Sequence, residues 1–478
     1  MNYLDNILAM RAELLVVAQI IFLIIYDLFA PKTAGKTIDF VSCALFLVIT
    51  AVGFIPQADV EAFGGMYLSS PITEIMKSAL NIGVILMFLQ SKMWLNSEQI
   101  AHKRAEVYIL VLSTLLGMYL MISSGHFLIF YIGLEMASLP LAALIAYNKY
   151  SYNSVEAGVK YILMAAFSSG LLLFGISLLY GSSGGAGLYF ESVRALAIPS
   201  SLTLLGLVFF LAGMAFKISL VPFHLWTADV YQGAPTNITA FLSVVSKSAA
   251  AFALMLVLFK VFPALFDYWE YVVYALIVAS ITIGNLFAMR QKNMKRFLAY
   301  SSISQAGYLL LGMLAGTAFG MTSAVYYVLV YTVANLGIFA IVSEIENRTG
   351  KTEISDYNGL YKTNPYLSVG MMLFLFSLAG IPPFAGFFSK FFVFAAAVEK
   401  EYYGLVFIAL INTVLSLYYY LLVVKAMFIG NDKITAIARL KTNGYTKTAL
   451  FIALAGTLLL GLLSCIFAYI EDFSFGLM

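Results

Sequence analysis

Long apolar stretches recur from one end of the chain to the other, and they constrain its fold more than any other feature. A helix needs roughly 20 mainly apolar residues to cross a bilayer. We therefore expect an all-α, polytopic membrane protein whose residues 1–478 form a single transmembrane domain. By the same rule the sequence predicts fourteen transmembrane helices, at residues 12–30, 38–56, 72–94, 106–123, 126–147, 157–180, 201–221, 236–260, 268–289, 296–317, 320–343, 366–396, 403–428 and 447–470.

Composition supports this fold class. Of the 478 residues, 62% are hydrophobic and only 11% are charged, and the mean hydropathy is +0.93. Charge this sparse cannot cover the surface of a soluble globule. The formal net charge is only +3, and the basic run at 290–296 is a short connector between two spans, so we expect no nucleic-acid partner.

The distribution of basic residues predicts how the chain lies in the membrane. An even number of spans puts both termini on one side. Nineteen of the 27 lysines and arginines lie in or beside the loops after the first, third, fifth, ninth, eleventh and thirteenth spans, and four lie at the opposite face. Because cytoplasmic loops are enriched in lysine and arginine, we expect both termini to be extracytoplasmic.

The four remaining basic residues lie inside apolar stretches, where a charge facing lipid costs roughly 2.5–3.5 kcal/mol at the bilayer centre. Lys77 is near the outer end of its span and one turn from Glu74, so we expect its side chain to extend to the membrane surface. Lys217, Lys247 and Lys390 lie deeper and need partners and water. For each of these three, a lysine tied to carbonyls at a helix break is the alternative to a role in ion transfer.

The stretch 213–247 brings several of these features together. Pro222 predicts a broken helix, because proline lacks an N–H and clashes with the preceding turn. Irregular backbone at membrane depth occurs only where it is buried in protein or lines a wet cavity. Lys217 precedes the break, and Lys247 lies about 15 Å into the next segment at a rise of about 1.5 Å per residue. Two lysines beside a broken helix indicate an ion path through the bilayer.

His224 follows the proline of this break. Its ordinary pKa of about 6.5 lies near neutrality, so the imidazole could pass protons. The alternative is that it caps the broken helix or bonds carbonyls that the break has freed.

Glu135 lies near the middle of the span 126–147, about 14 Å from its start. An unpaired carboxylate at that depth would protonate, and Lys217 is the expected counter-charge. Burial and mutual attraction act in opposite directions on the proton affinity of such a pair. Opening or closing the pair could therefore move a proton, with Lys247 as the central carrier and Lys390 as the last.

A second proline break, at Pro382 and Pro383, lies in the twelfth predicted span, five spans after the first break. Because the offset is odd, the second copy would cross the membrane in the opposite sense, as in transporters built from inverted repeats. The local similarity between the breaks is slight. We expect two inverted five-helix repeats with broken seventh and twelfth helices, arranged as N-terminal helices in 1–105, repeats in 106–260 and 268–428, and a C-terminal helix in 447–478.

The sequence lacks the patterns that hold common cofactors. Two cysteines, Cys43 and Cys465, cannot supply the four ligands of an iron–sulfur cluster, and the three histidines argue against a haem with two histidine ligands. No GxxxxGK[ST] phosphate loop is present, which argues against direct use of ATP. We therefore expect no cofactor and no metal in this chain.

Four stretches carry a resemblance to a known family: FKISLVPFHLWTADVYQGAPTNITAFLSVVSK (216–247), MKRFLAYSSISQAGY (294–308), YYVLVYTVANLGIFA (326–340) and SLAGIPPFAGFFSKFFVF (377–394). On these residues the chain resembles the antiporter-like subunit N family of proton-pumping NADH:quinone oxidoreductase, respiratory complex I. The resemblance implies a glutamate–lysine pair at Glu135 and Lys217, a central lysine at Lys247 and an exit-side lysine at Lys390.

The resemblance also implies a proton-translocating subunit of a translocase, without a redox centre of its own, in the bacterial plasma (inner) membrane. NAD, FMN, iron–sulfur clusters and quinone would be bound by partner subunits, which include sibling antiporter-like subunits, and the quinone pool would be reached only indirectly. Three alternatives stay open: a subunit of a multi-subunit sodium/proton antiporter, a membrane arm of a hydrogenase-type complex, and a scaffold whose buried charges only fix helix packing.

Overall fold

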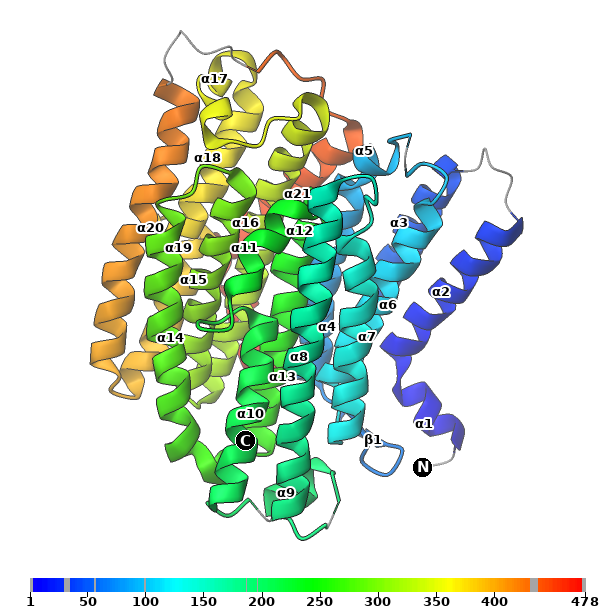
Figure 1. Ribbon diagram of the computed structural model, residues 1–478, viewed down its shortest axis with the longest axis vertical. Helices are drawn as coiled ribbons and strands as arrows, with labels where there is room; N and C mark the ends of the chain where they lie inside the picture. The colour runs from blue at the N-terminus through cyan, green and yellow to red at the C-terminus, as the bar shows by residue number, and fades with distance from the viewer. Residues whose placement is uncertain are drawn as a thin grey trace.

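The computed structural model describes residues 3–29, 35–55, 57–98, 100–185, 187–195, 197–429 and 437–474 as a bundle of helices (Figure 1). The first part contains the helices α1 (Tyr3–Ala9), α2 (Arg11–Phe29), α3 (Gly35–Gly53), α4 (Pro71–Gln90), α5 (Lys92–Leu95), α6 (Arg104–Ile122), α7 (Phe127–Ile145), α8 (Tyr152–Ser182), α9 (Phe190–Ala195), α10 (Ser201–Ile218), α11 (Leu225–Gly233), α12 (Thr236–Phe241), the π-helix η1 (Leu242–Ser246) and α13 (Lys247–Lys260).

The second part contains the 3₁₀ turn η2 (Pro263–Leu265), α14 (Phe266–Ala288), α15 (Met294–Leu314), α16 (Ala318–Thr349), the 3₁₀ turn η3 (Ile354–Tyr357), α17 (Leu360–Thr363), α18 (Pro365–Ala379), α19 (Ala385–Glu399), α20 (Tyr403–Ile429), α21 (Gly444–Leu462) and α22 (Ser464–Ser474). Two short strands, β1 (Val60–Ala62) and β2 (Tyr67–Ser69), pair antiparallel with Val60 opposite Ser69.

The predicted spans fall on helices throughout the described residues, which confirms an all-α, multi-pass membrane protein. Twelve of the described helices are long and apolar enough to cross a membrane, and shorter apolar helices at Thr37–Gly53 and Pro365–Ala379 cover two more predicted spans. The last predicted span is wrong as a single helix. Leu463 takes an extended conformation between α21 and α22, and the Ser474 hydroxyl reaches Thr322 of α16 at 2.8 Å. The packing of α22 against α16 redirects the chain after α21. Helical periodicity in the sequence does not reveal this contact.

Both predicted helix breaks are present, and they divide α10 from α11 and α18 from α19. In Figure 1 the chain runs upward from α10 to α11 and downward from α18 to α19. The two broken helices therefore cross the bundle in opposite directions, as an inverted repeat requires.

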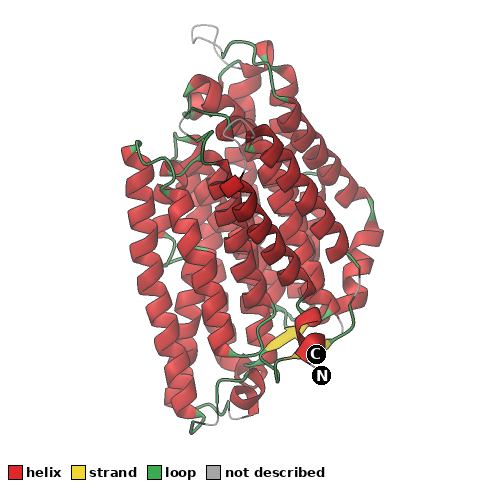
Figure 2. Cartoon of the chain, turned by 90° about the vertical axis from the view of Figure 1, so that its right-hand side faces the viewer, coloured by secondary structure: helices red, strands yellow, loops and turns green. Residues whose placement is uncertain are grey.

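The two ends of the bundle differ in character. One end carries α1, α9 and the β1–β2 hairpin, whose strands Figure 2 shows in yellow. The opposite end carries α5 and α17, together with the loops around Lys149, Lys292 and Arg348. We call this second end the basic end.

The centre of the bundle is formed by the spans that follow the first break. The segment Thr236–Lys260 is buried along its whole apolar length, and α15 and α16 are buried over almost all of theirs. The outer helix α2, by contrast, leaves most of its apolar residues exposed. Lys247, at the start of α13, therefore lies in the middle of the protein.

Candidate functional site

Several backbone groups freed by the break between α10 and α11 find new hydrogen-bond partners. Ser219 ends α10 in the left-handed conformation, with a φ of 66°, and the Leu220 amide returns to the Ala215 carbonyl at 2.8 Å. The Val221 amide donates to the Ser280 hydroxyl at 3.0 Å. The indole N–H of Trp226 donates to the Phe216 carbonyl at 3.2 Å. These bonds satisfy the groups that lose their helical partners, and they fix the end of α10 beside Lys217.

Lys217 lies in the last turn of α10, and its side chain is buried. Its ammonium donates to the Ser138 hydroxyl at 2.6 Å and to the Tyr161 hydroxyl at 3.1 Å. The predicted counter-charge, Glu135, lies one turn before Ser138 on α7. No direct ion pair joins these two described residues. In this structure the serine, rather than the carboxylate, holds the lysine.

Glu135 is only half buried, and one of its carboxylate oxygens, Oε1, has no hydrogen-bond partner among the described residues. Ile132 and Leu139, which flank it on the same helix, are about half exposed. Glu135 therefore lies between the interior, where Ser138 contacts Lys217, and the outer face of α7.

Lys247 has no acidic side chain in contact with it in the described part of the chain. Its ammonium donates to the Ser302 hydroxyl of α15 at 2.7 Å and lies 5.4 Å from the centre of the Tyr231 ring. A cavity of about 20 Å³ lies beside it, with a mainly apolar wall to which Gln305 and Tyr331 also contribute. That volume is sufficient for one water molecule.

His224 is the residue at the N-cap position of α11, but its side chain makes no capping hydrogen bond, and it is buried, 9% exposed. The ring nitrogen Nδ1 has no hydrogen-bond partner in the described residues. The structure thus places the histidine at the break, between Lys217 and Lys247 along the chain.

Lys390 lies in α19, just after the second break, and its side chain turns back toward the end of α18. Its ammonium donates to the Ala379 carbonyl at 3.2 Å and lies 4.9 Å from the centre of the Tyr308 ring. This contact is the one expected of a lysine tied to a carbonyl at a helix break. Gly386 donates its N–H to the Ser377 hydroxyl at 3.1 Å, and a side chain at Gly386 would collide with the Ser377 backbone.

Gln305 connects the two parts of the site, and sequence patterns did not single it out. It lines the cavity beside Lys247. Its amide donates to the Tyr420 hydroxyl at 3.2 Å and to the Leu378 carbonyl at 3.4 Å, one residue before the carbonyl that holds Lys390. The sequence feature that could have pointed to Gln305 is its position in the run 294–308, inside a central helix.

Hydroxyl groups are the other feature that sequence reasoning missed. Ser138, Tyr161, Tyr231 and Ser302 contact the first two lysines, yet serine and tyrosine are common in spans for packing reasons. Only the tertiary contacts distinguish these four from the rest.

The expectation that Lys77 extends to the membrane surface is wrong. The lysine is 1% exposed, and its ammonium forms ion pairs with Glu13 at 2.8 Å and with Glu74 at 2.9 Å. It also donates to the Tyr67 hydroxyl at 3.1 Å. The expectation failed because Glu13 comes from another helix, which sequence spacing does not reveal.

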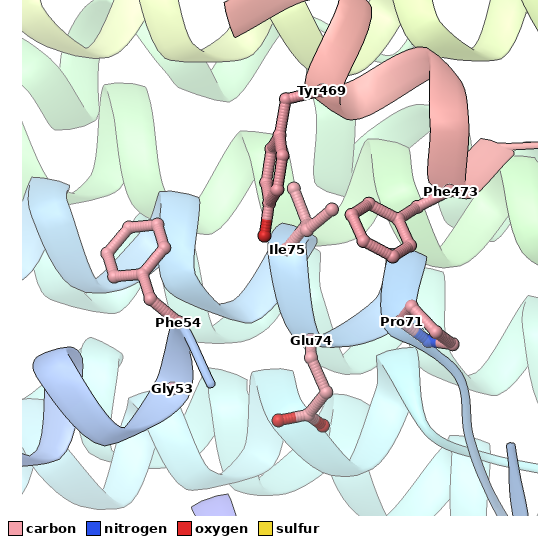
Figure 3. A pocket seen from close by; sticks show the side chains of 7 residues that line it. All are labelled: Gly53, Phe54, Pro71, Glu74, Ile75, Tyr469 and Phe473. Atoms are coloured by element: carbon pink, nitrogen blue, oxygen red, sulfur yellow. The ribbon is translucent and has the colours of Figure 1, made fainter. Parts of the chain in front are cut away.

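A small cavity of about 10 Å³ adjoins this cluster and is lined in part by Glu74 (Figure 3). Its lining also includes Tyr469 and Phe473 of α22, Ile75 of α4 and Phe54, which follows α3. The volume again corresponds to about one water molecule. The cluster lies in the N-terminal helices, apart from the three lysines at the centre.

Metal binding finds no support in the described residues. No group of three or more histidine, cysteine, aspartate or glutamate side chains converges on one point there.

Buried lysines without ion pairs, placed at two oppositely directed helix breaks, define a membrane protein of the ion-translocating class. Residues 124–416 match the family described as NADH:quinone oxidoreductase/Mrp antiporter, TM. This range contains all five residues of the predicted site, whereas the Lys77 cluster lies outside it.

The relative named NADH-quinone oxidoreductase subunit N in Phocaeicola vulgatus is 54% identical, over 98% of this chain and 98% of its own. A chain of respiratory complex I from Thermus thermophilus with bound aureothin superposes with a TM-score of 0.79 at 29% identity, covering 95% of this chain and 97% of that one. A chain of the Mrp complex from Dietzia shares the fold, with a TM-score of 0.84 at 20% identity over 99% of this chain and 97% of its own. The chain therefore belongs to the NADH:quinone oxidoreductase/Mrp antiporter family, among the subunit N relatives.

Proposed function

We propose that this chain translocates protons along Glu135, Lys217, His224, Lys247 and Lys390, as the membrane subunit N of an NADH:quinone oxidoreductase. Family membership and the 54% identity to a subunit N support this assignment over a sodium/proton antiporter or a hydrogenase-type complex. The protein is then an enzyme only as a non-redox subunit of a translocase.

The observation that carries the proposal is the surroundings of the central lysines. Lys217 and Lys247 are buried and bonded to hydroxyls rather than to carboxylates. A charge with no counter-ion is costly in an apolar interior, so both lysines can lose a proton without breaking an ion pair. A hydroxyl can accept a hydrogen bond from an ammonium and donate one to a neutral amine. Each lysine therefore keeps its partner in both protonation states.

The wider setting follows from the same assignment. NAD, FMN, iron–sulfur clusters and quinone are bound by partner subunits, and sibling antiporter-like subunits pack beside this one. The basic end faces the cytoplasm of a bacterial plasma (inner) membrane, because basic loops are retained on that side. Residues 106–260 and 268–428 act as the two repeats, each with one helix break.

Two measurements test the proposal. The first separates gently solubilised membranes on a native gel, stains for NADH dehydrogenase activity and probes for this chain, which should run in the stained high-mass band. Its presence only in a smaller, unstained complex would favour the antiporter alternative.

The second measurement follows NADH-driven acidification of inverted membrane vesicles. Lys217→Ala and Lys247→Met should each lower proton pumping by roughly 10²-fold or more, the usual scale for losing a positioned proton carrier, while the complex still assembles. Normal pumping by both variants would contradict the relay.

A further inference from the structure

Each of the three lysines in the proposed relay lies over the ring of a buried tyrosine. The pairs, with the distance from the ammonium nitrogen to the ring centre, are Lys217 and Tyr161 at 5.7 Å, Lys247 and Tyr231 at 5.4 Å, and Lys390 and Tyr308 at 4.9 Å. A lysine ammonium within about 6 Å of a ring centre is attracted by the negative face of the ring. No carboxylate forms an ion pair with any of these lysines in the described residues. A tyrosine ring is therefore a source of negative potential that all three lysines share.

At Lys390 the contact is made by the ring itself and not by the hydroxyl. Lys217 donates to the hydroxyl of its tyrosine at 3.1 Å, whereas the Tyr308 hydroxyl donates to the Ala409 carbonyl of α20 at 3.2 Å. Besides the ring, the Lys390 ammonium contacts the Ala379 carbonyl. Neither a ring face nor a carbonyl has a proton to donate to a neutral amine. Both partners of Lys390 therefore favour its charged form.

The Tyr308 ring is held in place by contacts that do not involve the ammonium. Tyr308 lies in α15, and its hydroxyl is 3.2 Å from the Ala409 carbonyl and 3.2 Å from the Thr413 hydroxyl, both on α20. Phe394, one turn after Lys390 on α19, packs against the ring, with the two ring centres 6.1 Å apart. The fold of the second break thus brings the lysine to a ring that α15 and α20 have already positioned.

We propose that the Tyr308 ring takes the place of an acidic side chain at Lys390 and keeps this lysine protonated between transfers. The proposal rests on the proton-relay function and adds a positioning residue to it, because Tyr308 acts through Lys390 and transfers no proton itself. A carboxylate in contact would form a buried ion pair, which is costly to break from one side. A ring face attracts the ammonium more weakly. The lysine can therefore hold its proton and still release it.

Two substitutions separate the ring of Tyr308 from its hydroxyl. Tyr308→Phe keeps the ring face, and NADH-driven pumping by inverted vesicles should stay close to the wild-type rate. Tyr308→Leu removes the attraction between the charged lysine and the ring. Pumping per assembled complex should then fall by about 10- to 30-fold, the scale of a desolvated cation–π contact. Equal pumping by the two variants would contradict the proposal.

A fluorinated ring tests the charge of the ring face while its packing is kept. Tyr308→trifluorophenylalanine has nearly the shape of Tyr308→Phe, but the fluorine atoms withdraw the negative charge on which the attraction depends. We expect this variant to pump more slowly than Tyr308→Phe, toward the rate of Tyr308→Leu. It also provides the test if the leucine variant does not assemble. A rate equal to that of Tyr308→Phe would show that the ring only fills space, and the proposal would be wrong.

Tyr326→Leu is the matched control. Tyr326 is buried on α16, and its hydroxyl also donates to a backbone carbonyl, that of Leu460. Within the described chain, no lysine or arginine lies over its ring. The control should lose thermal stability, as Tyr308→Leu does, but should pump normally per assembled complex. A loss of pumping as large as that of Tyr308→Leu would assign the effect to packing.

A double-mutant cycle tests the contact without measuring pumping. If the ring and the ammonium interact, Tyr308→Leu and Lys390→Met together should lower the melting temperature of the purified complex by less than the sum of their separate effects. Additive effects would overturn the role of the ring and leave the relay untouched.

Pumping separates failure of this proposal from failure of the relay. If Lys390→Met stops pumping while Tyr308→Leu and Tyr308→trifluorophenylalanine pump as the wild type does, the relay stands and the role of the ring is wrong. If Lys390→Met pumps normally, the proposed function fails at Lys390, and the role of Tyr308 fails with it.

Discussion

The two helix breaks hold their lysines in different ways. In the first half, Lys217 and Lys247 donate to the hydroxyls of Ser138 and Ser302. In the second half, Lys390 donates to the carbonyl of Ala379. A hydroxyl can accept or donate, whereas a carbonyl can only accept. The first two lysines therefore keep a hydrogen-bond partner when they lose a proton. Lys390 forms its strongest hydrogen bond to the carbonyl when it is charged.

The difference indicates where proton transfer couples to structure. When Lys217 or Lys247 loses its proton, the serine hydroxyl can turn toward the lysine nitrogen from the carbonyl to which it now donates, that of Leu134 for Ser138 and that of Ala299 for Ser302. Proton loss from Lys390 weakens its hold on the end of α18, because a neutral amine is a poorer donor to the Ala379 carbonyl than an ammonium. We therefore expect the second break, more than the first, to respond to its lysine's charge.

Replacing Lys390 should have the largest effect and tests this difference directly. Lys390→Met removes both the proton carrier and the donor to Ala379, so pumping should fall by roughly 10²-fold or more and thermal stability should drop. Lys390→Arg keeps a charged donor but does not release its proton, so it should recover stability without recovering pumping. Vesicle acidification and the melting temperature of the purified complex report the two effects. Normal pumping by Lys390→Arg would reduce Lys390 to a structural role.

Lys77→Met provides the contrast of a buried lysine outside the relay. It leaves Glu13 and Glu74 without their shared cation, and breaking a buried ion pair from one side costs about 3–5 kcal/mol. We expect less assembled complex and earlier thermal unfolding. The complexes that do assemble should pump at the normal rate per NADH oxidised, and a lower ratio would bring this cluster into the proton path.

The hydroxyl partners of the first half provide a smaller, paired test. Ser138→Ala and Ser302→Ala each remove a hydrogen bond to a charged group, worth about 1.5–3 kcal/mol, and should slow pumping several-fold. Ser368→Ala is the control, since that buried hydroxyl donates to the carbonyl of Asn364, the N-cap residue of α18, at 3.1 Å and has no hydrogen bond to a lysine among the described residues. Equal pumping by all three variants would remove the hydroxyls from the mechanism.

The smallest expected effect concerns Asp229, whose ion pairs anchor α11. In the second half, the described residues of α19 form no ion pair. Burial alone would raise the pKa of Asp229, but hydrogen bonds from Lys160 and Arg296 outweigh it and lower the pKa below the ordinary 3.8. Asp229→Asn should cost at most about 1 kcal/mol, because the partners are partly exposed.

The pH dependence of that effect has a definite sign. A lowered folded-state pKa gives stability that is present above the unfolded value of about 3.9 and is lost as the pH falls through the folded value. The melting temperatures of the wild type and Asp229→Asn should therefore differ most near neutral pH and converge below about pH 4. A constant difference across that range would exclude the carboxylate as its source.

Much of the architecture could be predicted from local sequence. Apolar length sets the spans, and Pro222 and Pro382 set the breaks, because both act through nearest neighbours in the chain. The end of α21 at Leu462 could not be found this way, since the turn after it depends on how α22 packs on α16.

The same distinction between local sequence and tertiary packing applies to the candidate site. The sequence by itself placed Lys217, Lys247 and Lys390 deep within spans, where a charge facing lipid is costly. Only the tertiary structure decided their partners: Ser138 rather than Glu135 for Lys217, Ser302 for Lys247, and a carbonyl for Lys390. Hydrogen bonds act over about 3 Å, and residues that lie far apart in the sequence reach that distance only when the helices pack.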